Sequence, residues 1–205
     1  MKYKVNSEFF CSYFYHASMA ESKAARSHVE ANGVCLEGIY SSMAAVVLLQ
    51  GALESYINFL IHSNGLGCRS GLVGTKQREL SGVGIKEKWR NLPTLVSGVR
   101  FQEDERPYTD FVKLVDLRND LVHFKAERFS CEIDIPAGCE TLEQVRQFVG
   151  QPGVLADHVL YDILAFGLAG PKVVRDMIET LHSILGSAPP TFLESEEILT
   201  IERIH

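Results

Sequence analysis

The stretch MAAVVLLQGALESYINFLI, residues 43–61, decides whether this chain forms a membrane span or the core helix of a bundle. Its length is close to the roughly 20 apolar residues that a bilayer-crossing helix needs. Gln50, Glu54 and Asn58 recur every four residues within it, which aligns them along one side of a helix. An ionised glutamate at mid-span is costly in lipid. We therefore predict the central helix of a water-soluble bundle, with no membrane as a partner.

The composition is that of an ordinary globular protein. Hydrophobic residues make up 46% of the 205 residues and charged residues 22%, which is enough apolar sequence for one sizeable core. The five cysteines are odd in number and show no Cys-x-x-Cys spacing, so neither a disulfide framework nor a zinc site is indicated. The N-terminus lacks the apolar stretch of a secretory signal. These features predict a cytoplasmic protein.

Helical periodicity recurs on both sides of this stretch, whereas the alternation typical of strands is scarce. Outward from it, we predict helices over residues 13–31, 36–62 (starting at Leu36 or Ser42), 85–97, 108–127, 141–150 and 158–186, the last interrupted at 167–171. Residues 65–84 are glycine-rich but lack both phosphate-binding glycine spacings, so a loop is expected there. The pattern predicts an all-α fold, an up-and-down helical bundle.

We expect a single domain over residues 1–190. Residues 129–154 are predicted to form a small irregular or short-β insertion, because FSCEIDIPAGCE combines β-branched residues with turn-forming ones. Pro189 and Pro190 are expected to end the ordered core, and residues 191–205 to form an acidic C-terminal tail, either mobile or docked.

Charge is distributed unevenly along the chain. The net charge of −6 argues against a generally basic nucleic-acid binder. Residues 64–100 nevertheless carry a net charge of +5, which leaves −11 on the remainder. This segment is either a solvated loop and helix face or a local phosphate-binding surface. Its candidate RNA-contacting residues are Arg69, Lys76, Arg78, Lys86, Lys88 and Arg90.

The stretch LRNDLVHFK, residues 117–125, places polar side chains within an amphipathic helix. On a helical wheel Arg118 falls inside an apolar stripe formed by Phe111, Leu114, Val115, Leu121 and Val122. Asn119 and His123 share a face beside this stripe, and Asp120 is expected to point towards solvent. A buried guanidinium needs an acidic partner, other acceptors or a water-filled cleft. In a purely structural interpretation, Arg118 pairs with Glu54 and His123 is an ordinary boundary histidine.

The run Arg118-Asn119-Asp120-Leu121-Val122-His123 resembles the Arg-x4-6-His motif of the HEPN superfamily, in which a polar residue, often Asn, follows the arginine. The upstream ALESYIN resembles the family's AxLExxxN helix, and KVVRDMIETLHSIL resembles a closing helix. The resemblance spans residues 39–185. It implies a HEPN-like helical bundle that pairs as a homodimer, with the motifs of two protomers forming one RNA-cleaving cleft.

The resemblance also implies a chemistry, namely metal-independent endoribonuclease cleavage through the 2′-hydroxyl of the RNA. Histidine titrates near neutrality, so His123 is expected to transfer protons. Arg118 is expected to hold the scissile phosphate, Asn119 to orient the histidine or bind a phosphate oxygen, and Glu54 and Asp120 to support them. A toxin or defence role, with a cognate antitoxin as partner, fits this activity.

No cofactor is expected, and no catalytic metal, because the histidines and cysteines lack ligand spacing. Two alternatives stay open. The same bundle serves as a non-catalytic HEPN-like module that binds a nucleotide or a protein partner. A helical scaffold in which Arg118 is structural also fits the sequence.

Overall fold

The computed structural model describes residues 2–5, 8–62, 75–123, 134–138, 141–149, 151, 158–194 and 201–204. Within them lie the helices α1 (Glu8–Asn32), α2 (Leu36–His62), α3 (Thr75–Ser81), α4 (Ile85–Ser97), α5 (Tyr108–His123), α6 (Leu142–Val149) and α7 (Val159–Leu185). A short 3-10 helix, η3 (Thr191–Leu193), and two strands, β1 (Lys2–Val5) and β2 (Ile201–Ile204), complete the elements. The all-α bundle predicted from helical periodicity is confirmed.

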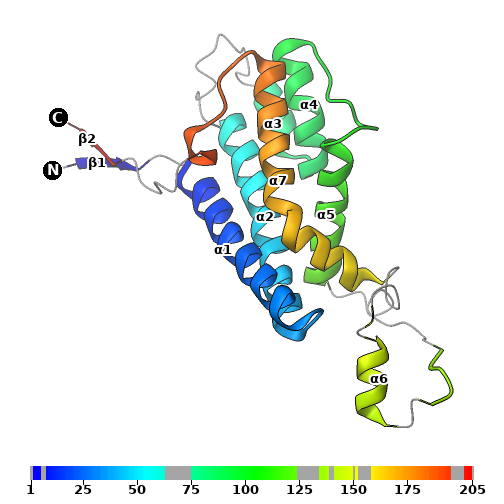
Figure 1. Cartoon of the computed structure of the whole chain (residues 1–205). Helices are drawn as coiled ribbons and strands as arrows, with labels where there is room; N and C mark the ends of the chain where they lie inside the picture. The colour runs from blue at the N-terminus through cyan, green and yellow to red at the C-terminus, as the bar shows by residue number, and fades with distance from the viewer. Residues whose placement is uncertain are drawn as a thin grey trace.

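Helix α2 occupies the centre of the bundle, between α1 and α7, with α5 also packed against it (Figure 1). Its side chains Leu49, Leu53 and Ile57 are completely buried. Among the described helices, α2 is the one long and apolar enough to cross a membrane, and 56% of its most apolar window is buried inside the protein. Packing on neighbouring helices therefore accounts for much of the apolar sequence of α2.

Helix α7 runs without interruption from Val159 to Leu185, so the break predicted at residues 167–171 is wrong. A Cβ atom at Gly167 would lie 2.3 Å from the Cβ of Ser42, and one at Gly170 would lie 2.2 Å from Cδ1 of Leu49. These glycines allow α7 to approach α2 closely. Pro171 costs the helix a backbone hydrogen bond, and Figure 1 shows that α7 bends along its course.

Helix α3 lies within the segment predicted to be a loop. Residues 63–74 lie outside the described residues, but Thr75–Ser81 is helical. The run KQREL consists of good helix formers, and Leu80 is buried, so local propensity and one apolar anchor outweigh the glycines around them. Helix α4 covers the predicted residues 85–97 and ends at Gly98, whose φ of 77° is in the left-handed region.

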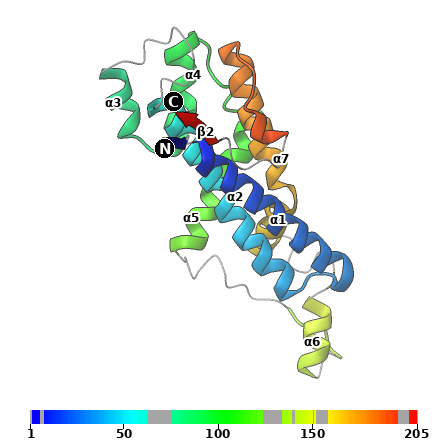
Figure 2. The ribbon, with the colours of Figure 1, turned by 90° about the vertical axis from the view of Figure 1, so that its left-hand side faces the viewer.

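Helix α6 confirms the predicted return to helical structure after residue 140. Thr141 Oγ1 accepts a hydrogen bond from the Gln144 backbone N–H at 3.2 Å, and Gln144 Oε1 accepts one from the Thr141 N–H at 2.9 Å. This reciprocal capping box starts the helix. Of the expected insertion, residues 129–133, 139, 140, 150 and 152–154 lie outside the described residues, and 134–138 form neither helix nor strand. Both views show α6 beyond the end of the bundle (Figures 1 and 2).

The ordered core extends past Pro190. Phe192 and Leu193 in η3 are buried, and the Phe192 ring contacts Tyr15 and Tyr56. Arg175 of α7 donates a hydrogen bond to the Leu193 carbonyl. The first part of the C-terminal tail is therefore docked on the bundle.

The two ends of the chain meet in a small antiparallel ribbon, which the sequence did not predict. Strand β1 pairs with β2 in a register that runs from Lys2 opposite Ile204 to Val5 opposite Ile201. Figure 1 shows this ribbon projecting away from the helical bundle.

Candidate functional site

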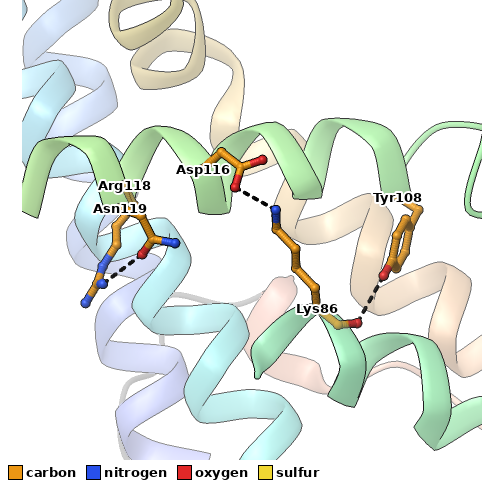
Figure 3. Close-up of polar contacts among 5 residues, drawn as sticks. All are labelled: Lys86, Tyr108, Asp116, Arg118 and Asn119. Atoms are coloured by element: carbon orange, nitrogen blue, oxygen red, sulfur yellow. Dashed lines mark hydrogen bonds and ion pairs between the residues drawn. The ribbon is translucent and has the colours of Figure 1, made fainter. Parts of the chain in front are cut away.

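Helix α5 carries the predicted motif and is anchored by its N-terminal two thirds. Phe111, Leu114 and Leu117 are buried against the bundle, where α5 packs on α7 and α2. On the opposite side of this region, Asp116 accepts an ion-paired hydrogen bond from Lys86 of α4 at 2.6 Å (Figure 3). Tyr108 donates to the Lys86 carbonyl at 3.0 Å. These contacts hold α5 at its start and middle, and the buried Asp120 and half-buried Leu121 anchor its last turn on the bundle.

Arg118 stands at the start of that last turn and is half-buried. Its Nη1 donates a hydrogen bond to Asn119 Oδ1 at 3.1 Å, and Figure 3 shows the two side chains lying together. Its Nε is buried and has no hydrogen-bond partner among the residues that the structure describes. A buried donor without an acceptor costs about 1–3 kcal/mol, and more on a charged group. Arg118 Nε therefore lacks a hydrogen-bond acceptor within the described part of the chain.

Glu54 does not pair with Arg118, although that pairing was expected. Its Oε2 accepts a hydrogen bond from Gln50 Nε2 at 2.7 Å instead, one helical turn away on α2. Among the described residues, no ion pair joins Glu54 to Arg118. The Arg118–Glu54 ion pair that the structural interpretation requires is therefore absent from the described part of the chain.

Asp120 is buried, with only 2% of its surface exposed. The prediction that its side chain points towards solvent is therefore wrong. The buried face of the helix is wide enough to include both Leu117 and Asp120. Val122, which the wheel placed in the apolar stripe, is 49% exposed.

His123 is the last residue of α5 and is exposed. It stands one turn beyond Asn119 on the same face, as predicted from their spacing. In the single chain, the described contacts of Arg118 and Asn119 do not include His123. Arg118, Asn119 and His123 therefore lie within six residues of one helix. Arg118 and Asn119 are hydrogen-bonded to each other, but the described hydrogen bonds do not join His123 to either of them.

The basic residues of segment 64–100 separate into different environments. Lys88 is buried, and its Nζ donates to Asn58 at 2.9 Å, so it supports packing between α4 and α2. Arg90 forms long ion pairs with Glu87 at 3.9 Å and Glu103 at 3.8 Å. Lys86 is held by Asp116, as described above. Arg78 is exposed on α3, whereas Arg69 and the side chain of Lys76 lie outside the described residues.

A buried polar chain was missed at the sequence level. The Tyr56 hydroxyl is hydrogen-bonded to His182 Nε2, and His182 Nδ1 lies 2.8 Å from Ser187 Oγ. Burial lowers the pKa of His182 below its ordinary value. The signal was available, because His182 lies four residues after the buried Ile178 on the apolar face of α7.

No family model, curated protein or solved structure matches this chain. Within the described part of the chain, no group of three or more His, Cys, Asp or Glu side chains is placed to hold a metal ion. The molecule is an α-helical bundle, and its candidate site is the Arg118–Asn119 pair near the C-terminal end of α5.

Proposed function

We propose that this chain is a HEPN-like, metal-independent endoribonuclease that works as a homodimer in the cytoplasm. The observation that carries the proposal is Arg118 Nε, a buried donor that has no acceptor among the described residues and lies near the exposed Val122 and His123 at the end of α5. A phosphate oxygen supplies the missing acceptor, and guanidinium groups bind phosphate through parallel N–H donors. The sequence resemblance to HEPN proteins supports the same assignment.

The proposed reaction uses His123 from each protomer of a two-fold pair. One His123 takes the proton from the RNA 2′-hydroxyl, whose oxygen forms a bond to phosphorus while the bond from phosphorus to the 5′-oxygen breaks. The other His123 returns a proton to the departing 5′-oxygen. Arg118 stabilises the charge that develops on the phosphate oxygens, and Asn119 fixes the guanidinium through its 3.1 Å hydrogen bond. The products are a 2′,3′-cyclic phosphate and a 5′-hydroxyl.

Contacts to the RNA backbone outside the cleft come from exposed basic residues. Arg78 meets this requirement directly, because it is exposed on α3. Lys86 and Arg90 also qualify, since their side chains are 34% and 41% exposed and their ion pairs lie at the surface. Lys88 is omitted from this set because its Nζ is committed to Asn58. A toxin or defence role with a cognate antitoxin is consistent with this activity.

The second candidate is a HEPN-like module that binds a nucleotide or a protein partner without cleaving RNA. The observation that favours it is the separation of His123 from the Arg118–Asn119 pair in the single chain. Such a module needs Arg118 for binding and does not need His123. A scaffold with a structural Arg118 is the third reading, and it needs Arg118 for stability alone.

One experiment separates the three. Purified chain is incubated with mixed RNA in EDTA beside Arg118→Ala, Arg118→Lys and His123→Ala, and each variant is checked by urea unfolding. Lys113→Ala is the matched control, because it removes an exposed cation from the same helix. The ribonuclease predicts cleavage in EDTA that falls about 10²–10⁴-fold in His123→Ala and is not restored by the point charge of Arg118→Lys.

The other outcomes are equally definite. Intact RNA together with nucleotide binding that requires Arg118 but not His123 supports the second candidate. Loss of folding in Arg118→Ala with no RNA effect in His123→Ala supports the scaffold. Cleavage that survives in both Arg118→Ala and His123→Ala contradicts the proposed site.

A further inference from the structure

The segment after α7 folds back on the bundle as a strap, which we define as residues 187–194. It runs from the end of α7 to the start of α1 (Figure 1). Its Phe192 and Leu193 are buried, and the Phe192 ring packs edge-on against Tyr15 and Tyr56, with ring centroids 5.9 Å apart in each case. Arg175 donates a hydrogen bond to the Leu193 carbonyl. These contacts attach the C-terminal half of the strap to α1, α2 and α7.

The first residue of the strap is hydrogen-bonded to a buried histidine. His182 is 7% exposed, its Nε2 is hydrogen-bonded to the Tyr56 hydroxyl, and its Nδ1 lies 2.8 Å from Ser187 Oγ. A neutral imidazole suits this position, because it has one donor and one acceptor, and each hydroxyl can take either role. Protonation makes both ring nitrogens donors and places a cation between two uncharged hydroxyls in a buried site. The closed strap of the structure therefore favours the neutral ring.

The charged side chains on the elements around His182 interact with groups other than its ring. On α7, Arg175 Nη1 lies 3.7 Å from Glu179 Oε1. Glu194 of the strap is exposed, and α1 contributes a second histidine, His16, whose ring lies edge-on to Tyr15. The described polar contacts of α2, α4 and α5 join Glu54 to Gln50, Lys86 to Asp116, and Arg90 to Glu87 and Glu103. Burial, and not a charged neighbour, lowers the pKa of His182.

We propose that the strap opens locally on acidification, with protonation of His182 as the trigger. Opening separates Ser187 from the ring and brings His182 to water, which solvates the cation. The open form therefore binds a proton with the ordinary histidine pKa of 6.5, whereas the closed form binds it only at lower pH. As the pH falls below about 6.5, the equilibrium shifts towards the open form, which uncovers the rings of Tyr15 and Tyr56. This inference does not depend on the proposed ribonuclease.

Amide hydrogen exchange of the full chain measures the opening. The Leu193 and Glu194 N–H groups donate to the carbonyls of Pro190 and Thr191, so they exchange when the strap opens. The opening constant is the observed exchange rate divided by the intrinsic rate at the same pH. Between pH 6.5 and 5.5 this constant should rise by up to about fivefold, the limit for one proton that the open form binds with a pKa of 6.5. Core amides of α2 should have smaller opening constants, because they exchange through global unfolding.

Three variants isolate the trigger. His182→Gln keeps a side chain that forms hydrogen bonds but does not titrate, so its opening constant should be the same at both pH values. His16→Gln is the matched control, because it removes the other histidine near the aromatic rings and should keep the wild-type rise. Arg175→Ala should raise the opening constant at both pH values, since the Leu193 carbonyl loses its donor. Circular dichroism checks that each variant is folded.

Three results overturn the inference. Equal opening constants at pH 6.5 and 5.5 in wild type remove the link between opening and protonation. A rise that persists in His182→Gln, or disappears in His16→Gln, assigns the trigger to another group. Strap amides that exchange no faster than those of α2 show that the strap does not open on its own. If His182→Gln does not fold, titration of the wild-type ring by NMR decides, because a His182 pKa at or above 6.5 contradicts the trigger and a lower one supports it.

Discussion

Replacing Gly167 by alanine tests the close approach of α2 and α7. The new Cβ would lie 2.3 Å from Ser42 Cβ and 2.6 Å from Ser42 Cα. A side-chain clash is relieved by rotation, but the contact with Cα is relieved only when the two helix backbones separate. Overpacking of this kind costs about 1–3 kcal/mol, and we expect the upper end of that range because backbone atoms are involved.

The magnitude follows from two opposing effects. Alanine in place of glycine favours a helix interior by about 1 kcal/mol. Subtracting this from an overpacking cost of about 3 kcal/mol leaves a net loss of about 2 kcal/mol in the free energy of unfolding. For a chain of this length the melting temperature should fall by about 4–8 °C. Urea unfolding followed by circular dichroism measures the free energy, and a thermal scan measures the shift.

Gly51→Ala is the matched control, since it makes the same change within α2. The nearest atoms to a Cβ at Gly51 belong to Phe14 at 3.5 Å, an ordinary contact distance. This variant should therefore gain up to about 1 kcal/mol. In the Gly167→Ala background, Ser42→Gly should restore part of the lost stability, because it removes Cβ and Oγ but leaves Cα in place. Wild-type or higher stability of Gly167→Ala, with the expected gain in Gly51→Ala, would refute the close approach.

The remaining predictions concern the buried polar chain, α4 and the docked tail. Because burial lowers the pKa of His182, the folded chain resists a proton that the unfolded chain accepts near pH 6.5, so stability should fall as the pH drops below about 6.5; urea midpoints at several pH values should show a smaller dependence in His182→Gln. Lys88→Ala should lower the free energy of unfolding in urea by about 1–3 kcal/mol, because the partly buried Asn58 loses its donor. Arg78→Ala should weaken RNA binding in a filter assay without changing the urea midpoint. Phe192→Ala should lower the free energy of unfolding by about 3 kcal/mol, and an unchanged midpoint would mean that η3 is not docked.

The parts of the fold that were predictable are those in which local signals agree. Residues 85–97 were predicted as a helix from helical periodicity, and α4 has those bounds. The interruption at residues 167–171 was wrong because glycine and proline are local breaker signals. The role of Gly167 and Gly170 in α7 is set by Ser42 and Leu49, which lie far away in the sequence. A single sequence does not reveal such tertiary contacts.

The candidate site shows the same division. The i, i+4 spacing of Asn119 and His123 gave their shared face correctly. The wheel misplaced Asp120 because it gives only the direction in which each side chain leaves the helix. It does not show how much of the circumference of α5 the neighbouring helices bury, or where along α5 that burial ends. The pairing of Glu54 with Gln50, and not with Arg118, depends on side-chain geometry that residue spacing leaves open.

The last turn of α5 contains two mismatches of opposite kind in the single chain. Val122 belongs to the apolar stripe and is 49% exposed, whereas Arg118 Nε is a buried charged donor that has no acceptor within the described ranges of the chain. A monomeric scaffold leaves both in place, since Glu54 already accepts from Gln50. A protein partner that covers Val122 removes the first but supplies an acceptor only by chance. A second copy of α5 with a phosphate between the two helices removes both, because the copy covers the valine and the phosphate accepts from the guanidinium.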